Sequence, residues 1–216
     1  MRLCPLCEAS HIEHFHQDKR RDYFQCQRCQ LIYADPDCLL DPEQEKGVYD
    51  QHQNDSDDLG YRRFLSRVAE PLLARLPNGR WQGLDFGSGP GPTLSVMLEE
   101  AGHQMAIYDP YFAPERSVLA RQYDFITCTE AIEHFYTPGK EWQQLLSMLK
   151  PGGWLGLMTK LALDIEAFAR WHYKNDPTHV SFFSQATFRY LAKRDGLEVE
   201  FVGNDVILLR KPSHDS

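Results

Sequence analysis

The sequence "LDFGSGPGPT", residues 84–93, contains three glycines at alternate positions behind a carboxylate. A turn of this kind between a strand and a helix binds nucleotide-like ligands in parallel α/β folds. A phosphate-binding loop would end in Gly-Lys-Ser or Gly-Lys-Thr, which this turn lacks. Asp85 would repel a pyrophosphate but would attract an ammonium or a sulfonium group. The turn therefore predicts a positively charged ligand such as S-adenosylmethionine, which carries both groups and no phosphate.

Helices and strands alternate around this turn from residue 61 onward. Strands are expected at 81–86, 104–109, 123–130 and 152–159, and a closing antiparallel pair at 197–203 and 205–210. Helices are expected at 61–76, 92–102, 139–150 and 184–196, and Pro71 should kink or divide the first of them. Alternation of this kind predicts an α/β fold with a mostly parallel sheet covered on both faces.

A second carboxylate supports an adenosyl ligand. Asp109 ends the strand "QMAIYD" 24 positions after Asp85, where an acidic side chain can accept hydrogen bonds from both ribose hydroxyls. Only 13 residues then separate Asp109 from Tyr123, too few for another helix and strand. Tyr108, Pro110, Tyr111 and Phe112 offer an apolar or stacking surface for the adenine ring.

Four motifs in register, "LDFGSGPG", "IYDP", "YDFITCTEAIEHF" and "LLSMLKPGGWLGLMT", resemble those of class I S-adenosylmethionine-dependent methyltransferases over residues 80–160. The resemblance implies a Rossmann-like sheet of seven strands in the order 3-2-1-4-5-7-6, with strand 7 antiparallel and strand 3 short or absent here. It also implies that Asp109 binds the ribose and that Thr129 and Glu130 lie beside the sulfonium. The cofactor-binding residues it implies at the first turn are Asp85, Gly87, Ser88, Gly89 and Gly91.

The N-terminal segment contains two Cys-x-x-Cys pairs, separated by eighteen residues. Two such pairs form a tetrahedral thiolate site for Zn²⁺, so Cys4, Cys7, Cys26 and Cys29 predict a zinc ribbon with a short hairpin between the pairs. Four thiolates close the coordination sphere, which indicates a structural ion. We therefore expect a zinc-ribbon module at 1–40, an acidic linker at 41–60 able to fold over its neighbour, and a methyltransferase domain at 61–216.

The net charge of -8 is concentrated in the linker, where seven acids oppose one lysine. Nucleic-acid binding usually rests on a dense basic face, which the sequence does not offer. A small-molecule acceptor is therefore favoured. An RNA methyltransferase that recognises its substrate through the zinc ribbon and a non-catalytic S-adenosylmethionine-binding module remain alternatives. An NAD-dependent oxidoreductase is disfavoured by the glycine spacing. No apolar run predicts a membrane span or a signal peptide, so a cytoplasmic protein is expected.

Residues on two segments are candidates for the acceptor side. His134 follows the strand 123–130 and should face the cleft. The segment 168–184 is polar and aromatic, and its candidate substrate-binding residues are Trp171, His172, Tyr173 and Asp176. We expect this segment to form the acceptor wall, with His134 or His179 as the proton acceptor. The alternatives are rings that only pack the segment in place, and a metal site of His172, Asp176 and His179.

Overall fold

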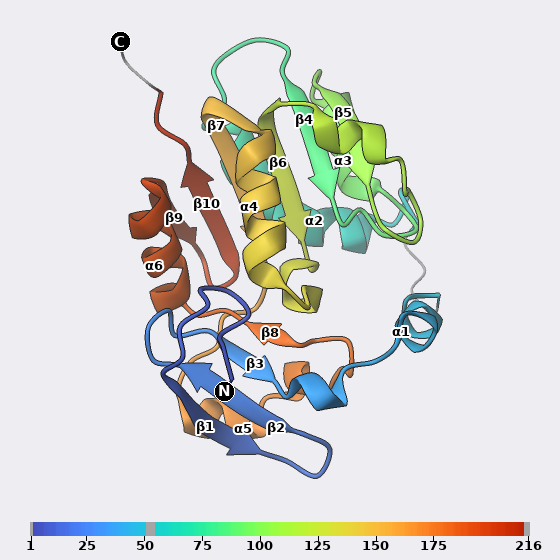
Figure 1. Ribbon diagram of the computed structural model, residues 1–216. Helices are drawn as coiled ribbons and strands as arrows, with labels where there is room; N and C mark the ends of the chain where they lie inside the picture. Colours follow the sequence, from blue (N-terminus) through green and yellow to red (C-terminus); the bar gives the residue numbers. More distant parts are fainter. Residues whose placement is uncertain (1, 51–54, 214–216) are drawn as a thin grey trace.

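The larger of two β-sheets in the computed structural model, which describes residues 2–50 and 55–213, is the mostly parallel sheet that was expected (Figure 1). Its strand order is β5-β4-β6-β7-β10-β9. The strands are β4 (Gln82–Phe86), β5 (Gln104–Tyr108), β6 (Tyr123–Thr129), β7 (Leu149–Met158), β9 (Glu198–Val202) and β10 (Val206–Arg210). β4 to β7 pair in parallel, whereas β10 is antiparallel to both of its neighbours. The predicted fold class is confirmed.

The sheet has the expected order without the family's third strand in the described part of the chain. The 13 residues between Asp109 and Tyr123 contain a single antiparallel bridge, from Asp109 to Ala113, and the short 3-10 helix η2 (Arg116–Ala120). A helix and a strand do not fit in this length. The predicted loss of strand 3 is therefore confirmed, and β5 becomes an edge strand.

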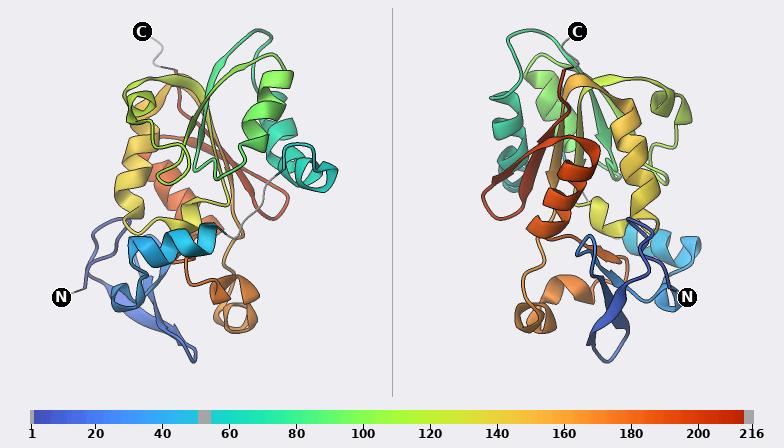
Figure 2. Two further views of the ribbon diagram at one scale, coloured as in Figure 1. Left: turned by 90° about the vertical axis from the view of Figure 1, so that its right-hand side faces the viewer. Right: turned by 60° about the vertical axis from the view of Figure 1, so that its left-hand side comes forward.

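Four helices cover the two faces of this sheet (Figure 2). They are α2 (Leu59–Leu73) and α3 (Thr93–Glu100) on one face, and α4 (Pro138–Met148) and α6 (Gln185–Asp195) on the other. Successive strand residues point to opposite faces, so Phe125 packs with α2 and α3 while Ile126 packs with α4 and α6. α2 is not divided at Pro71 but continues for two more residues to Leu73, so the hydrogen bond that Pro71 cannot donate is lost only in the last turn of the helix.

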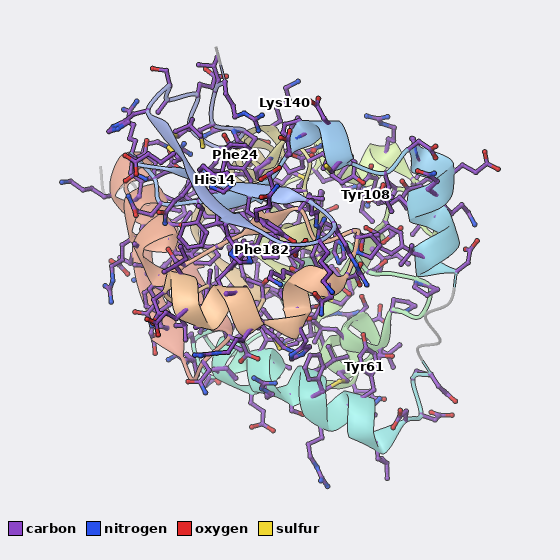
Figure 3. The ribbon with its side chains drawn as sticks, turned by 90° about the horizontal axis from the view of Figure 1, so that it is seen from below. His14, Phe24, Tyr61, Tyr108, Lys140 and Phe182 are labelled. Atoms are coloured by element: carbon purple, nitrogen blue, oxygen red, sulfur yellow. The ribbon has the colours of Figure 1, made fainter. Side chains whose placement is uncertain are left out.

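The smaller sheet joins the N-terminal module to the connection that follows β7 (Figure 1). Its strands are β1 (Ile12–Gln17), β2 (Asp22–Cys26), β3 (Ile32–Ala34) and β8 (Ser181–Phe182), in that order. β1 and β2 form the predicted hairpin, and β3 pairs antiparallel with β8. Phe168 packs edge-on against both Tyr23 and Phe182, with ring centroids 5.1 and 5.3 Å apart. Figure 3 labels Phe24 of β2 and Phe182 of β8 on this sheet. The ribbon is thus held to the segment 168–184.

The segment expected as a linker includes a regular helix, α1 (Pro42–Tyr49), and the beginning of α2, while residues 51–54 lie outside the described residues. Asp41 caps α1 by accepting from the backbone N–H groups of Glu43 and Gln44. Glu45 accepts a hydrogen bond of 2.6 Å from the Tyr111 hydroxyl, which fixes α1 across the end of β5. Negative charge therefore does not keep α1 unfolded, because a capping box and a tertiary contact order this helix.

The remaining elements are short and lie in connections. They are α5 (Ile165–Arg170) and the 3-10 helices η1 (Pro36–Cys38), η3 (Ile132–His134) and η4 (His172–Asn175). No helix within the described ranges has the length and apolar character to cross a membrane.

Candidate active site

A cavity of about 760 Å³ lies at the carboxyl ends of β4, β5 and β6. Its wall is formed by the glycine turn, the residues after β5 and β6, the helices α1, α2 and α4, and the connection before β8. Tyr61 and Tyr108, labelled in Figure 3, both line it. All eight predicted cofactor-binding residues lie on this wall: Asp85, Gly87, Ser88, Gly89, Gly91, Asp109, Thr129 and Glu130. The volume is typical of a site for a small organic ligand.

The glycine turn needs two residues without side chains. Gly87 and Gly89 have φ angles of +76° and +65°, in the left-handed region that favours glycine. A Cβ on Gly87 would also lie 2.6 Å from the Cβ of Ala131. The turn is fixed to β5, because the backbone N–H groups of Gly87 and Ser88 donate to the carbonyl of Tyr108 over 2.8 and 3.2 Å. The backbone therefore closely approaches the space where a ligand would lie.

Asp85 is buried at the end of β4, with 2% of its surface exposed. Its carboxylate accepts hydrogen bonds from the hydroxyls of Thr127 over 2.8 Å and Ser95 over 3.3 Å. Burial nevertheless raises the pKa of Asp85 to about 6. A positively charged ligand in the cavity would stabilise the ionised form.

Asp85→Asn is expected to stabilise the ligand-free protein increasingly as the pH rises from about 4 to about 6. The pKa of Asp85 is higher in the folded chain, about 6, than in an unfolded chain, about 3.9. The unfolded chain therefore loses this proton first, and the free energy of unfolding falls over that range and stays low above it. Asparagine can keep both hydroxyl partners without a charge. Thermal unfolding of both proteins at pH 4 and 7 measures the effect, and an equal difference at both pH values would contradict it.

Asp109 is held at the cavity wall by three backbone N–H groups. Its Oδ1 accepts from Tyr111 and Phe112 over 2.9 and 3.0 Å, and its Oδ2 accepts from Gly89 over 3.0 Å. This links the end of β5 to the glycine turn. The residues proposed as an apolar or stacking surface for the adenine ring, Tyr108, Pro110, Tyr111 and Phe112, line the cavity beside it.

Two glutamates meet a tyrosine beyond the end of β6. Glu130 has a φ of +47°, and its backbone N–H donates to the carbonyl of Met158 over 2.7 Å. The Tyr173 hydroxyl donates to Glu133 and lies 3.5 Å from Oε2 of Glu130. Burial and the charge of Glu133 raise the pKa of Glu130, while burial raises that of Glu133. Two carboxylates are thus crowded in one poorly solvated part of the cavity.

His134 and His179 come together on the same side of the cavity, with ring centroids 4.7 Å apart. Nδ1 of His134 lies 3.1 Å from the carbonyl of Thr178, and Nδ1 of His179 lies 2.7 Å from the carbonyl of Tyr173. A carbonyl only accepts, so each Nδ1 is the N–H donor, and Nε2 carries a lone pair whenever its ring is neutral. Burial lowers the pKa of His179 to about 4, so this ring is neutral at pH 7.

Comparison with known proteins agrees with this geometry. A family model described as a methyltransferase domain matches residues 60–201. The chain belongs to this methyltransferase family. It is a methyltransferase, as the resemblance implied, and this favours an enzyme over a non-catalytic binding module.

Two solved structures illustrate the shared fold. The PH0226 protein of Pyrococcus horikoshii has a TM-score of 0.53 and 18% identity, over 77% of this chain and 99% of that one. The magnesium protoporphyrin IX methyltransferase of Synechocystis, with bound S-adenosylmethionine, has a TM-score of 0.51 and 14% identity, over 78% of this chain and 90% of that one. No curated protein matches the sequence. At these identities the likeness shows the fold alone.

The predicted acceptor segment of the methyltransferase is only partly in the cavity. Asp176 lines it, and its Oδ2 lies 3.8 Å from Nε2 of His179. Tyr173 is buried behind the wall, with Trp171 stacked on it at 5.0 Å. His172 lies outside the cavity, 3.4 Å from Nζ of Lys160. The alternative metal site of His172, Asp176 and His179 is therefore not formed, because the 3-10 turn η4 directs His172 away.

The four cysteines of the methyltransferase's ribbon come together, with Sγ atoms all within 4.8 Å of one another. The two Cys-x-x-Cys loops have the same backbone: Glu8 and Gln30, which follow each pair, have φ angles of +58° and +62°. Cys4 and Ala9 share a hydrogen bond of 2.9 Å, and Cys26 and Leu31 share the equivalent one of 3.0 Å. Each of these two similar turns places two sulfur atoms on one side, and the four sulfurs face a common centre.

Two groups stand out among the cavity residues of the methyltransferase that sequence reasoning missed. Glu133 belongs to the motif "TEAIEHF", in which only His134 was assigned a role on the acceptor side. Glu45 and Tyr49 of α1 also line the cavity. The signal for α1 was the sequence "DPEQ" at 41–44, an aspartate followed by proline and, three positions on, glutamine, which is a capping box.

Asp109→Ala is expected to weaken binding of S-adenosylmethionine by about 1–3 kcal/mol, the loss of hydrogen bonds to a charged group. Isothermal titration calorimetry measures this. Glu115→Ala is the matched control, because Glu115 also accepts from a backbone N–H in the β5–β6 connection, over 2.9 Å, but lies outside the cavity wall. Unchanged affinity in a folded Asp109 variant would refute the ribose assignment.

Proposed function

We propose that the methyltransferase methylates a hydroxyl oxygen of a small molecule that binds beside His134 and His179. The observation that carries this proposal is the pair of imidazoles, each with its Nδ1 at a backbone carbonyl and its Nε2 able to accept a proton. Methyl transfer needs a base only where the acceptor must lose a proton, as a hydroxyl must. A buried pair of this kind is suited to such an acceptor.

The residues at the other end of the cavity fit S-adenosylmethionine. Asp85 and Asp109 provide negative charge for a cationic ligand, and the Ser88 hydroxyl is buried with no hydrogen-bond partner among the described residues. When bound, S-adenosylmethionine supplies the methyl group, whose bond to the acceptor oxygen forms as its bond to sulfur breaks and leaves the electron pair on sulfur. We propose that the glycine turn holds the methionine part and that Thr129 and Glu130 lie near the sulfonium.

The protein's part in the reaction is to orient the acceptor, exclude water and take its proton. The proton passes from the acceptor hydroxyl to Nε2 of His134 or His179. Asp176, 3.8 Å from Nε2 of His179, stabilises the imidazolium that results. α1 and the connection before β8 contribute to the cavity wall and limit the size of the acceptor.

The charge of the cavity supports a small acceptor over RNA. Its wall contains Glu45, Asp109, Glu130, Glu141 and Asp176, and no lysine or arginine among the described residues. Phosphate groups would meet repulsion there and would find no basic partner. An RNA acceptor would have to place its base in the cavity with the backbone held elsewhere.

The ribbon is proposed to hold one structural Zn²⁺. The Sγ atoms of Cys4 and Cys29 lie 3.5 Å apart, as do those of Cys7 and Cys26. Sulfurs about 2.3 Å from a tetrahedral ion are about 3.8 Å from one another, so the four cysteines fit zinc after a small expansion. The ion would stabilise the small sheet and take no part in methyl transfer.

A panel of small hydroxylated compounds and RNA transcripts, each supplied with S-adenosylmethionine, tests the function. The expected result is S-adenosylhomocysteine release with a small hydroxylated compound and a product heavier by one CH₂ on oxygen. Methylation of RNA with no turnover of small acceptors would refute the proposal.

A further inference from the structure

The side chains of Glu133, His134 and His179 form a second cluster of potential metal ligands, distinct from the cysteines. One ligand atom from each lies within 4.8 Å of the others. Glu133 and His134 lie on η3, directly after β6, whereas His179 precedes β8. All three line the acceptor side of the cavity. Residues from two distant segments thus converge at one point.

Both imidazoles are oriented as metal-binding histidines usually are. Each Nδ1 donates to a backbone carbonyl, from Thr178 for His134 and from Tyr173 for His179. A hydrogen bond of this kind fixes the ring and its tautomer and leaves Nε2 as the ligand atom. The two carbonyls belong to the segment that contains His179, so one loop fixes both rings.

Glu133 supplies a separate observation that points to a ligand. Its side chain is 1% exposed, and one carboxylate oxygen accepts from the Tyr173 hydroxyl. The other oxygen, Oε2, is buried and has no hydrogen-bond partner within the described part of the chain. An unpartnered buried carboxylate oxygen is costly unless a cation or a donor compensates it. Oε1 lies 4.0 Å from Nε2 of His134, so this carboxylate faces the imidazoles.

We infer that Glu133, His134 and His179 bind one divalent transition-metal ion at the acceptor end of the cavity. Two imidazole nitrogens and one carboxylate oxygen suit a first-row divalent ion and leave coordination positions open. Ligands at about 2.1 Å from one ion are about 3.0–3.5 Å apart, so the three atoms approach by about 1 Å or slightly more on binding.

The role of the ion rests on the proposed function, whereas its binding does not. A hydroxyl next to such an ion loses its proton more readily. The ion would then occupy both Nε2 lone pairs, so the acceptor proton would pass to the carboxylate of Asp176, which lines the cavity with its Oδ2 3.8 Å from Nε2 of His179. The acceptor oxygen would also be held in place for the transfer.

Mn²⁺ titration of zinc-loaded protein, followed by electron paramagnetic resonance, tests the site. Mn²⁺ prefers oxygen and nitrogen ligands and does not displace zinc from thiolates. We expect one bound Mn²⁺ per chain, with affinity lowered at least 10-fold in Glu133→Gln and in His179→Ala. His11→Ala, which removes a histidine exposed on the hairpin side, should bind as the native protein does. No binding at millimolar Mn²⁺, or equal affinity in all four proteins, would overturn the inference.

Electron spin echo modulation of the native protein covers the case in which the variants do not fold. Modulation from imidazole nitrogen supports the site, and bound Mn²⁺ without it overturns the inference. Failure of the proposed function can be distinguished from failure of the metal site. Mn²⁺ bound at the cluster with no methylation of small hydroxyl acceptors would refute the function alone. Full methylation by protein that binds no Mn²⁺ would refute the inference alone. A histidine would then accept the proton of the acceptor directly.

Discussion

His179→Ala is expected to lower the turnover of methyl transfer by about 10²-fold or more and to leave S-adenosylmethionine binding nearly unchanged. His179 lies on the acceptor side of the cavity, beside His134 and Asp176, and no hydrogen bond between described residues joins it to the glycine turn. The substitution removes either a proton acceptor or a metal ligand, and both roles serve the acceptor. Single-turnover rates and calorimetric affinity measure the two effects separately.

His134→Ala should have an effect of the same kind, because its Nε2 faces the same point. His179→Gln keeps a polar side chain of similar length, but its amide has no basic nitrogen lone pair to take a proton or bind a metal ion as the imidazole does, so it should not rescue turnover. His11→Ala is the control for loss of a histidine elsewhere. Native turnover in both His134→Ala and His179→Ala, or a collapse of S-adenosylmethionine binding, would show that the histidines do not serve the acceptor.

The parts of the fold predicted from the sequence depend on local patterns. The glycine turn is specified by Gly87 and Gly89, which adopt positive φ angles. Asp85, just before the turn, supplies the carboxylate. The absence of strand 3 followed from a residue count between Asp109 and Tyr123. Each of these features is set within about 25 residues, so the sequence contains the whole signal.

The parts that were not predicted depend on contacts between distant segments. The pairing of β3 with β8 joins residues about 150 positions apart, and nothing in either short strand specifies the other. The position of α1 depends on the contact between Glu45 and Tyr111. The buried position of Glu133 depends on Tyr173, which reaches it from η4. Local periodicity does not contain this information. The sequence therefore predicted both histidines in the cleft but not Glu133, the carboxylate beside them.

Removal of zinc, or Cys29→Ser, is expected to unfold the small sheet and to destabilise it on the order of 4 kcal/mol, as loss of a structural metal does. Cys29 is fully buried, and the ribbon's other buried side chains, such as Leu31 and Tyr33, pack on the main domain and do not form a core of their own. Metal analysis of the native protein should find one zinc per chain. Cys38→Ser is the control, because Cys38 is exposed on η1 and lies outside the cysteine cluster. A native protein with intact thiols and no zinc would contradict the prediction.

Loss of zinc should disturb the structure of the acceptor side of the cavity more than that of the cofactor side. β3 pairs with β8, which begins two residues after His179, so unfolding of the ribbon releases one side of the loop that fixes both histidines. The glycine turn and Asp109 are instead held by β4, β5 and their own hydrogen bonds. Zinc-depleted protein should therefore retain most of its affinity for S-adenosylmethionine while its turnover falls by an amount close to that of His179→Ala. Hydrogen exchange should rise in residues 176–182 and remain slow in β4. Equal loss of cofactor affinity and turnover would mean that the ribbon supports the whole domain, and unchanged turnover would mean that β8 holds His179 without the ribbon.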